Sequence, residues 1–154
     1  LEERFRMGGA SSLRGFALDS VGPRNRGVSG ECADEDLGAG EECWVPTGGD
    51  VMVGGTFEIA APAPLLGLRG LGDMDIVAFL DAGTSVFALQ DVETDYAPGD
   101  DVDGRAPWLR FGPGIGLRYA TPVGPLALDL GFNPWRLERH RESLLRLHFA
   151  LGAF

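Results

Sequence analysis

The stretch from Leu109 to Phe132, "LRFGPGIGLRYATPVGPLALDLGF", decides the fold because its residues alternate between two chemistries. In the first half, large apolar residues take most odd positions, while arginine and glycine take the even ones. In the second half, leucine and phenylalanine alternate with alanine, aspartate and glycine, and "PVGP" between the halves is typical of a tight turn. A period of two residues indicates a β-strand. The stretch therefore predicts an antiparallel hairpin with one apolar and one polar face.

The same period occurs in three further segments, which are residues 50–62, 73–86 and 144–154. Together with the hairpin they predict five antiparallel strands, and the alternation places Glu58 and Asp81 on the polar face. Residues 1–16 are expected to be a strand end that runs into a glycine-rich stretch. Residues 17–49 and 91–107 lack the period and are rich in glycine and acidic residues, so we expect two long loops there.

Composition narrows the class of protein. The chain has 154 residues, enough for one domain, and its 24 glycines and 10 prolines favour short elements joined by turns. The net charge of −10 argues against nucleic acid as a partner. No apolar run reaches the length of about 18 residues that a spanning helix needs. The opening "LEERFRMGG" has neither a starting methionine nor a signal peptide, so we expect a chain cut from a longer precursor.

Short connections alternate with longer loops along the predicted strands, which is the layout of an outer-membrane β-barrel. One predicted face is continuously apolar, and the other carries arginine, glycine and aspartate, which suits a crowded polar lumen. A soluble β-sandwich also produces alternation, so the pattern alone leaves both folds open. The arginines and glycines of the polar face favour the barrel.

Two cysteines, Cys32 and Cys43, enclose an acidic segment. Their even number and short separation favour a disulfide in an oxidising compartment, with free thiols or metal ligands as alternatives. Neither His140 nor His148 has metal-site spacing to them, and "GDDVDG" at 99–104 lacks the downstream acidic ligand of a calcium loop. We therefore expect no metal and no cofactor.

Three stretches together resemble the C-terminal barrel region of BamA-type outer-membrane assembly factors, in the bacterial surface antigen superfamily. They are "ERFRMGGASSLRGF" at 3–16, "FEIAAP" at 57–62 followed by "FLDAGTSV" at 79–86, and the stretch at 109–132 continuing to the terminal aromatic residue. Their order also matches, and the resemblance covers nearly the whole chain. Within the superfamily, the TamA type fits almost as well as the BamA type.

The resemblance implies a role for the first stretch. In the family, a long loop folds back into the barrel lumen, where its arginine meets inward-facing acidic residues. Carried over, the arginine is Arg14 and its partners are Glu58 and Asp81. A guanidinium engages a carboxylate through two parallel hydrogen bonds, and a buried pair of this kind is costly to break. Other family features fall on the bending glycines, the wall-packing aromatic and the C-terminal strand signal, which are Gly8, Gly9, Gly15, Phe16, Phe149 and Phe154.

The resemblance also implies function and location. Such proteins perform no bond chemistry and are not enzymes. They help nascent outer-membrane proteins, their clients, to enter the bilayer of a Gram-negative outer membrane. Membrane lipid and assembly lipoproteins, the latter through periplasmic POTRA domains, are the other expected partners.

Residues 1–154 would be the C-terminal part of the barrel, with 1–49 as strand end and loop and 50–154 as the strands up to the seam. The alternatives are a passive pore or structural barrel, and a soluble β-sandwich binding domain.

Overall fold

The computed structural model describes most of the chain, namely residues 4–27, 43–68, 70, 73–86, 109–122, 124–136 and 142–152. The backbone alone is described for residues 25–27 and 43–44. Residues 91–107, Cys32 and Phe154 lie outside these ranges, as does the side chain of Cys43. The predicted disulfide and the terminal aromatic signal therefore stay predictions. Among the described residues, no helix is long and apolar enough to cross a membrane.

The described residues form seven β-strands and one 3-10 helix. They are β1 (Arg24–Gly27), β2 (Cys43–Pro46), β3 (Val51–Pro62), η1 (Ala63–Leu66), β4 (Asp75–Val86), β5 (Arg110–Thr121), β6 (Gly124–Phe132) and β7 (Leu145–Leu151). Strands β3 to β7 make one antiparallel sheet in chain order, in which each strand pairs with its sequence neighbours. The predicted antiparallel all-β fold is therefore confirmed. The sheet is open, since β3 and β7 each pair on one side only within the part of the chain described.

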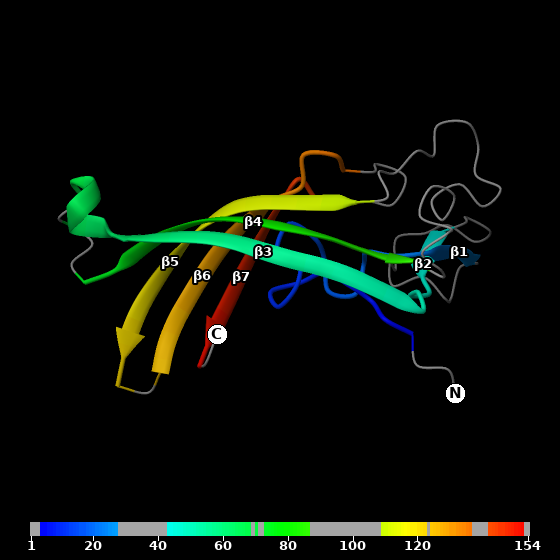
Figure 1. Ribbon diagram of the computed structural model, residues 1–154, viewed down its shortest axis with the longest axis horizontal. Coiled ribbons are helices and arrows are strands. Elements are labelled where there is room, and N and C mark those ends of the chain that lie inside the picture. Colours follow the sequence, from blue (N-terminus) through cyan, green and yellow to red (C-terminus); the bar gives the residue numbers. More distant parts are fainter. Residues whose placement is uncertain are drawn as a thin grey trace.

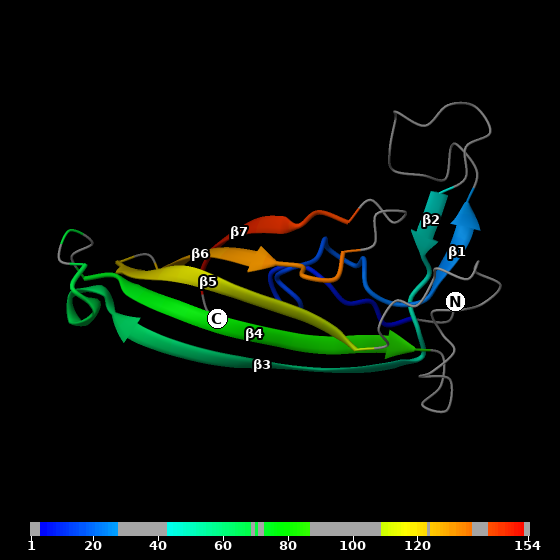
Figure 2. The same ribbon diagram turned by 90° about the horizontal axis from the view of Figure 1, so that it is seen from above.

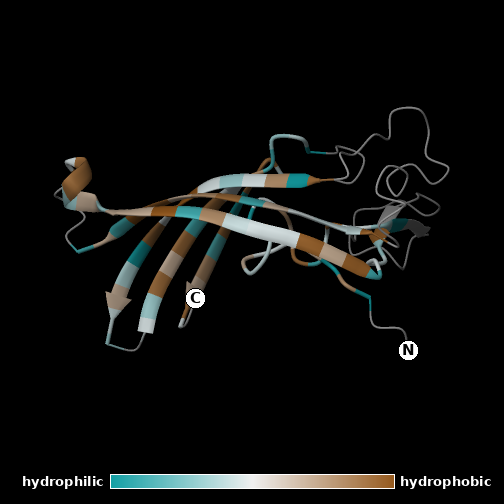
Figure 3. Cartoon of the chain, viewed as in Figure 1, coloured by the Kyte–Doolittle hydropathy of each residue, from teal (hydrophilic) through white to brown (hydrophobic). Residues whose placement is uncertain are grey.

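The sheet is strongly curved, and the N-terminal segment lies on its concave side (Figures 1 and 2). The two faces differ in chemistry because successive side chains of a strand point to opposite sides. Figure 3 shows the resulting alternation of hydropathy along the strands. The large apolar residues exposed on the convex face are Val53, Phe57, Ile59, Leu80, Ile115, Tyr119, Leu128, Phe132, Leu145, Leu147, Phe149 and Leu151. The residues buried on the concave face include Val77, Phe79, Asp81, Arg110, Ala127 and Asp129.

The core lies between the N-terminal segment and the concave face rather than between two sheets. Its apolar centre is a cluster of buried residues from the segment, Met7, Leu13, Phe16 and Val21. Backbone hydrogen bonds close the segment on itself between Met7 and Val21, and join Phe5 to Gly49. The only other sheet in the described part of the chain is the β1–β2 pair, which projects from one end (Figure 2). The arrangement is thus not the β-sandwich that the alternation had left open.

The prediction of a loop without strands at 17–49 was wrong in one respect, because β1 and β2 pair within it. These strands have four residues each, "RNRG" and "CWVP", and neither shows a period of two. A run of four residues is too short for a period of two in hydropathy to give a signal.

Candidate functional site

The tip of the N-terminal segment is shaped by glycines in backbone conformations that other residues avoid. Gly8 has φ 118° and Gly9 has φ 91°. The backbone N–H of Gly8 donates to Ser12 Oγ at 2.9 Å, and that hydroxyl donates to the Gly8 carbonyl at 3.1 Å. Phe16 N–H donates to the Leu13 carbonyl at 3.0 Å. Arg14 lies inside the turn closed by Leu13 and Phe16, which presents it to the sheet.

Arg14 binds Asp81 of β4 through three hydrogen bonds. Its backbone N–H and its Nε both donate to Asp81 Oδ2 at 2.9 Å, and its Nη2 donates to Oδ1 at 2.8 Å. The two side-chain bonds form the parallel fork that a guanidinium makes with a carboxylate. Asp81 is fully buried and also accepts a hydrogen bond from Thr56 Oγ1 at 2.9 Å. Both oxygens of this buried charge are therefore satisfied.

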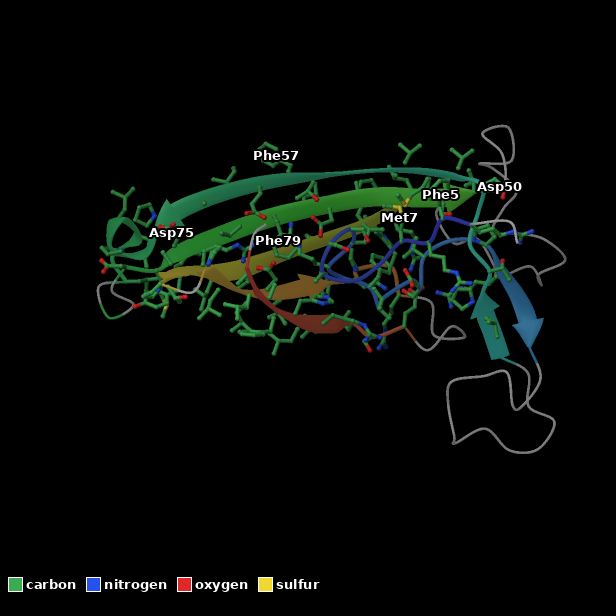
Figure 4. All side chains as sticks on the ribbon, turned by 90° about the horizontal axis from the view of Figure 1, so that it is seen from below. Phe5, Met7, Asp50, Phe57, Asp75 and Phe79 are labelled. Carbon is green, nitrogen blue, oxygen red and sulfur yellow. The ribbon has the colours of Figure 1, made fainter. Side chains whose placement is uncertain are left out.

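The same guanidinium reaches two further carboxylates through Nη1. This nitrogen donates to Glu58 Oε2 of β3 at 2.9 Å and to Asp129 Oδ2 of β6 at 3.1 Å. The guanidinium carbon also lies 3.4 Å from the ring centroid of Phe79, which is a cation–π contact. Figure 4 shows Phe79 pointing to the concave side and Phe57 pointing away from it.

Arg118 of β5 is the second cation of the site. It forms a bidentate pair with Asp129, with Nη2 at 3.1 Å from Oδ2 and a shorter contact between Nη1 and Oδ1. Its Nη2 also lies 3.5 Å from Glu58 Oε2. We call these five residues, Arg14, Glu58, Asp81, Arg118 and Asp129, the Arg14 cluster. Its two cations and three carboxylates leave a formal charge of −1, so most of the charge is balanced locally.

Strand β7 joins the site through His148. Its Nε2 donates to the carbonyl oxygen of Arg14 at 2.7 Å. Arg14 alone therefore contacts four of the five strands, with β3, β4 and β6 reached by its guanidinium and β7 reached by its carbonyl group.

Glycines of the sheet allow the segment to approach this closely. A Cβ at Gly131 would overlap the Arg14 carbonyl group, and one at Gly15 would lie 2.7 Å from the Phe132 carbonyl oxygen. A Cβ at Gly112 would lie 3.0 Å from the Gly15 nitrogen. Backbone thus packs on backbone where the segment crosses β5 and β6.

Burial and charge act in opposite directions on Arg14. Removal from water lowers the pKa of its guanidinium, but the hydrogen bonds that it donates to Asp81, Glu58 and Asp129 raise the pKa more. The net pKa lies above the ordinary value for arginine, so Arg14 stays charged at any physiological pH.

A second ion cluster lies nearer the β1–β2 end. Glu142 contacts Arg110 of β5 at short range, lies 3.5 Å from Arg24 Nη2, and accepts from Asn133 Nδ2 at 2.9 Å. The Arg110 guanidinium carbon lies 4.8 Å from the ring centroid of Phe16. We call Glu142, Arg110, Arg24 and Asn133 the Glu142 cluster. Through Glu142, the cluster links Arg24, at the end of the N-terminal segment, to β5 and to Asn133 at the end of β6.

The structure brings together most of the predicted site residues. Arg14, Glu58 and Asp81 meet directly, Gly8, Gly9 and Gly15 lie at the bends and close approaches of the segment, and Phe16 is buried beneath it. Phe149 is elsewhere, on the convex face of β7 and 68% exposed.

Sequence reasoning missed several members, which are Asp129, Arg118, Phe79, His148 and the Glu142 cluster. Their position on the polar face was a usable signal for the first four.

The arrangement is a fixed ion cluster rather than a reaction centre. Each carboxylate of the Arg14 cluster is engaged by arginine, and both arginines are held by more than one partner. No group of three or more metal-ligating side chains occurs among the residues that the structure describes. What such a cluster can do is hold the segment and the strands in one relative position.

Comparisons with known proteins give three similarities. The model of the Omp85 superfamily domain matches residues 1–154. The outer envelope protein 80, chloroplastic, of Arabidopsis thaliana is 28% identical over 151 residues, which cover 97% of this chain and 15% of the relative. A crystal structure of BamA from Haemophilus ducreyi lacking POTRA domains 1–3 superposes with a TM-score of 0.54 at 25% identity, covering 95% of this chain and 26% of that one. The chain thus spans only a minor part of each protein.

Proposed function

We propose, because this chain belongs to the Omp85 superfamily, that it forms part of a membrane β-barrel that inserts β-barrel proteins into an outer membrane or translocates polypeptides across it. The family match confirms the BamA/TamA-type resemblance inferred from the sequence. The proposal concerns the whole protein, of which the chain would supply residues 1–49 as the lumen segment and 50–154 as the wall. The proposed role makes and breaks no covalent bond.

The convex face supports placement in a membrane. Its exposed apolar residues follow all five strands, whereas charged residues gather on the concave face. A water-soluble sheet would need a second layer to cover such a face, but lipid covers it in a barrel. The concave face would line the lumen.

The observation that carries the proposal is the seating of Arg14 on the concave face. A passive pore needs an open lumen, but here a whole segment crosses it and is fixed by ion pairs to β3, β4 and β6. Ions buried in this way cost desolvation energy and are weak evidence for stability alone. We infer that the cluster holds the lumen segment in register with the wall while the barrel works on a client.

Location and partners follow from the same family membership. We propose the outer membrane of a Gram-negative bacterium, with nascent outer-membrane proteins as clients and with lipoproteins as partners of periplasmic domains. The Arabidopsis relative is named as a chloroplast outer envelope protein, so related chains also occur outside bacteria. The proposal covers the BamA and TamA types together.

A reconstitution experiment tests the proposal. The full-length protein containing this chain is placed in phospholipid liposomes, and a urea-unfolded outer-membrane protein is added. Client folding is followed by heat-modifiable gel migration, with empty liposomes as control. We expect faster client folding with the protein present. Ion conductance without any acceleration would instead support a passive pore and overturn the proposal.

A further inference from the structure

The turn between β3 and β4 displays three leucines to its surroundings. Leu65 is 78% exposed, Leu66 is 53% exposed and Leu68 is 47% exposed. No charged residue occurs from Ala60 to Leu68. Turns outside the core are usually polar, and a contiguous apolar group of this kind marks a contact surface.

Backbone hydrogen bonds hold the part of the turn from Ala63 to Leu68 in place, so this exposure is a feature of the fold. Ala63 is fully buried and its N–H donates to the Met74 carbonyl at 2.9 Å. Gly67 adopts φ 81° and donates to the Pro64 carbonyl at 3.1 Å, and Leu68 donates to the Ala63 carbonyl at 3.0 Å. The backbone of η1 thus finds hydrogen-bond partners locally, while its leucines stay largely exposed.

The position of η1 indicates what covers these leucines. Figure 1 shows it beyond the ends of β3 and β4, away from the β1–β2 pair. The short β5–β6 turn lies at this same end, whereas β4 ends and β5 begins at the opposite end. In outer-membrane barrels the short turns face the periplasm. The large apolar residues of the convex face that lie nearest to this turn are Ile59 on β3 and Ile76 on β4. Figure 3 shows η1 in brown, the colour of hydrophobic residues.

We propose that η1 lies in the phospholipid leaflet on the short-turn side, with Leu65, Leu66 and Leu68 at the boundary between headgroups and acyl chains. Interfacial segments bury their apolar side chains at this depth while their backbone stays hydrogen-bonded. The turn would then anchor the β3–β4 hairpin, which holds Glu58 and Asp81 of the Arg14 cluster, at a fixed depth. This inference rests on the proposed membrane location of the barrel.

Photo-cross-linking in native membranes tests it. The full-length protein carries p-benzoylphenylalanine in place of Leu65, and parallel variants carry it in place of Phe57 or Ala60. Phe57 is on the convex face and serves as the lipid-facing control, whereas Ala60 is on the concave face of the same strand and serves as the lumen control. After irradiation, mass spectrometry identifies phospholipid and protein adducts. We expect lipid adducts at Leu65 in yield similar to Phe57, and their loss at Ala60.

Each other outcome overturns the inference in a different way. A protein adduct at Leu65 would mean that the leucines dock a protein partner. No adduct at Leu65, with a lipid adduct at Phe57, would place η1 in water. Absence of lipid adducts at Phe57 as well would contradict the membrane location itself, and so the proposed function.

Discussion

His148 Nε2 lies 2.7 Å from the carbonyl oxygen of Arg14, and this hydrogen bond joins the N-terminal segment to β7. In the same sheet register, His148 pairs with Asp129, whose carboxylate binds the Arg14 side chain. The two bonds differ in kind, since one uses the backbone of Arg14 and the other its guanidinium. The contact to β7 can therefore be removed without touching the ion pairs.

His148→Leu should loosen β7 while leaving the rest of the Arg14 cluster in place. A single hydrogen bond contributes about 0.5–1.5 kcal/mol, so amide exchange in β7 should accelerate up to about tenfold. Hydrogen exchange with mass spectrometry on the full-length protein measures this. His148→Gln restores a donor and should return β7 to near the original exchange rate. Equal exchange in the Leu and Gln variants would show that the bond does not hold the strand.

Arg14→Ala should destabilise the folded protein more than any other single change in the segment. It leaves the fully buried Asp81 carboxylate without its cation, and breaking a buried pair costs about 3–5 kcal/mol. Arg14→Lys keeps the charge but loses the fork and should fall between Ala and the original residue. The midpoint of thermal unfolding reports the effect. Arg6→Ala, at an exposed arginine of the same segment, is the control, and an equal loss there would contradict the role of the cluster.

Much of the sheet was predictable because its chemistry repeats every two residues. Alternation placed Glu58, Asp81, Asp129 and His148 on the polar face, and the structure has them all on the concave side. Alternation predicts on which face of the sheet a residue lies. It does not predict which residues of the neighbouring strands lie opposite, because that depends on the register between strands. The register sets Asp129 opposite Gly116, close to Arg118, and no local pattern in the sequence encodes that distance.

The N-terminal segment was less predictable for a different reason. Its conformation rests on two glycines at positive φ and on backbone contacts with the wall, so it shows no hydrophobic period. Only the resemblance to a family placed Arg14 inside the barrel. In the Glu142 cluster only Arg110 carried a signal, its place on the polar face of β5, because its partners Arg24 and Glu142 lie far from it in the chain and outside the five-stranded sheet.

Gly131→Ala should disturb the packing of the N-terminal segment against β6, whereas Gly55→Ala should not. A Cβ at Gly131 would overlap the Arg14 carbonyl group, which is backbone and cannot rotate away. Overpacking of this kind costs roughly 1–3 kcal/mol. A Cβ at Gly55, in β3, would meet nothing within 4 Å, so that substitution is a matched control. Urea unfolding followed by heat-modifiable migration compares the two variants, and equal midpoints would argue against the close approach.

Glu142→Ala should remove the contacts that Arg24 and Arg110 make with this carboxylate, while the Arg14 cluster stays formed. Arg110 is 2% exposed, so losing the carboxylate leaves a buried cation without its partner, at a cost of about 3–5 kcal/mol.

Limited proteolysis of the full-length protein should then show faster cleavage near Arg24, which binds the same carboxylate. Replacing the buried pair together, as Arg110→Met with Glu142→Leu, removes both charges and should recover part of the lost stability. If the double variant is as unstable as Glu142→Ala, the loss arises from packing in the β6–β7 connection and not from the stranded Arg110 charge.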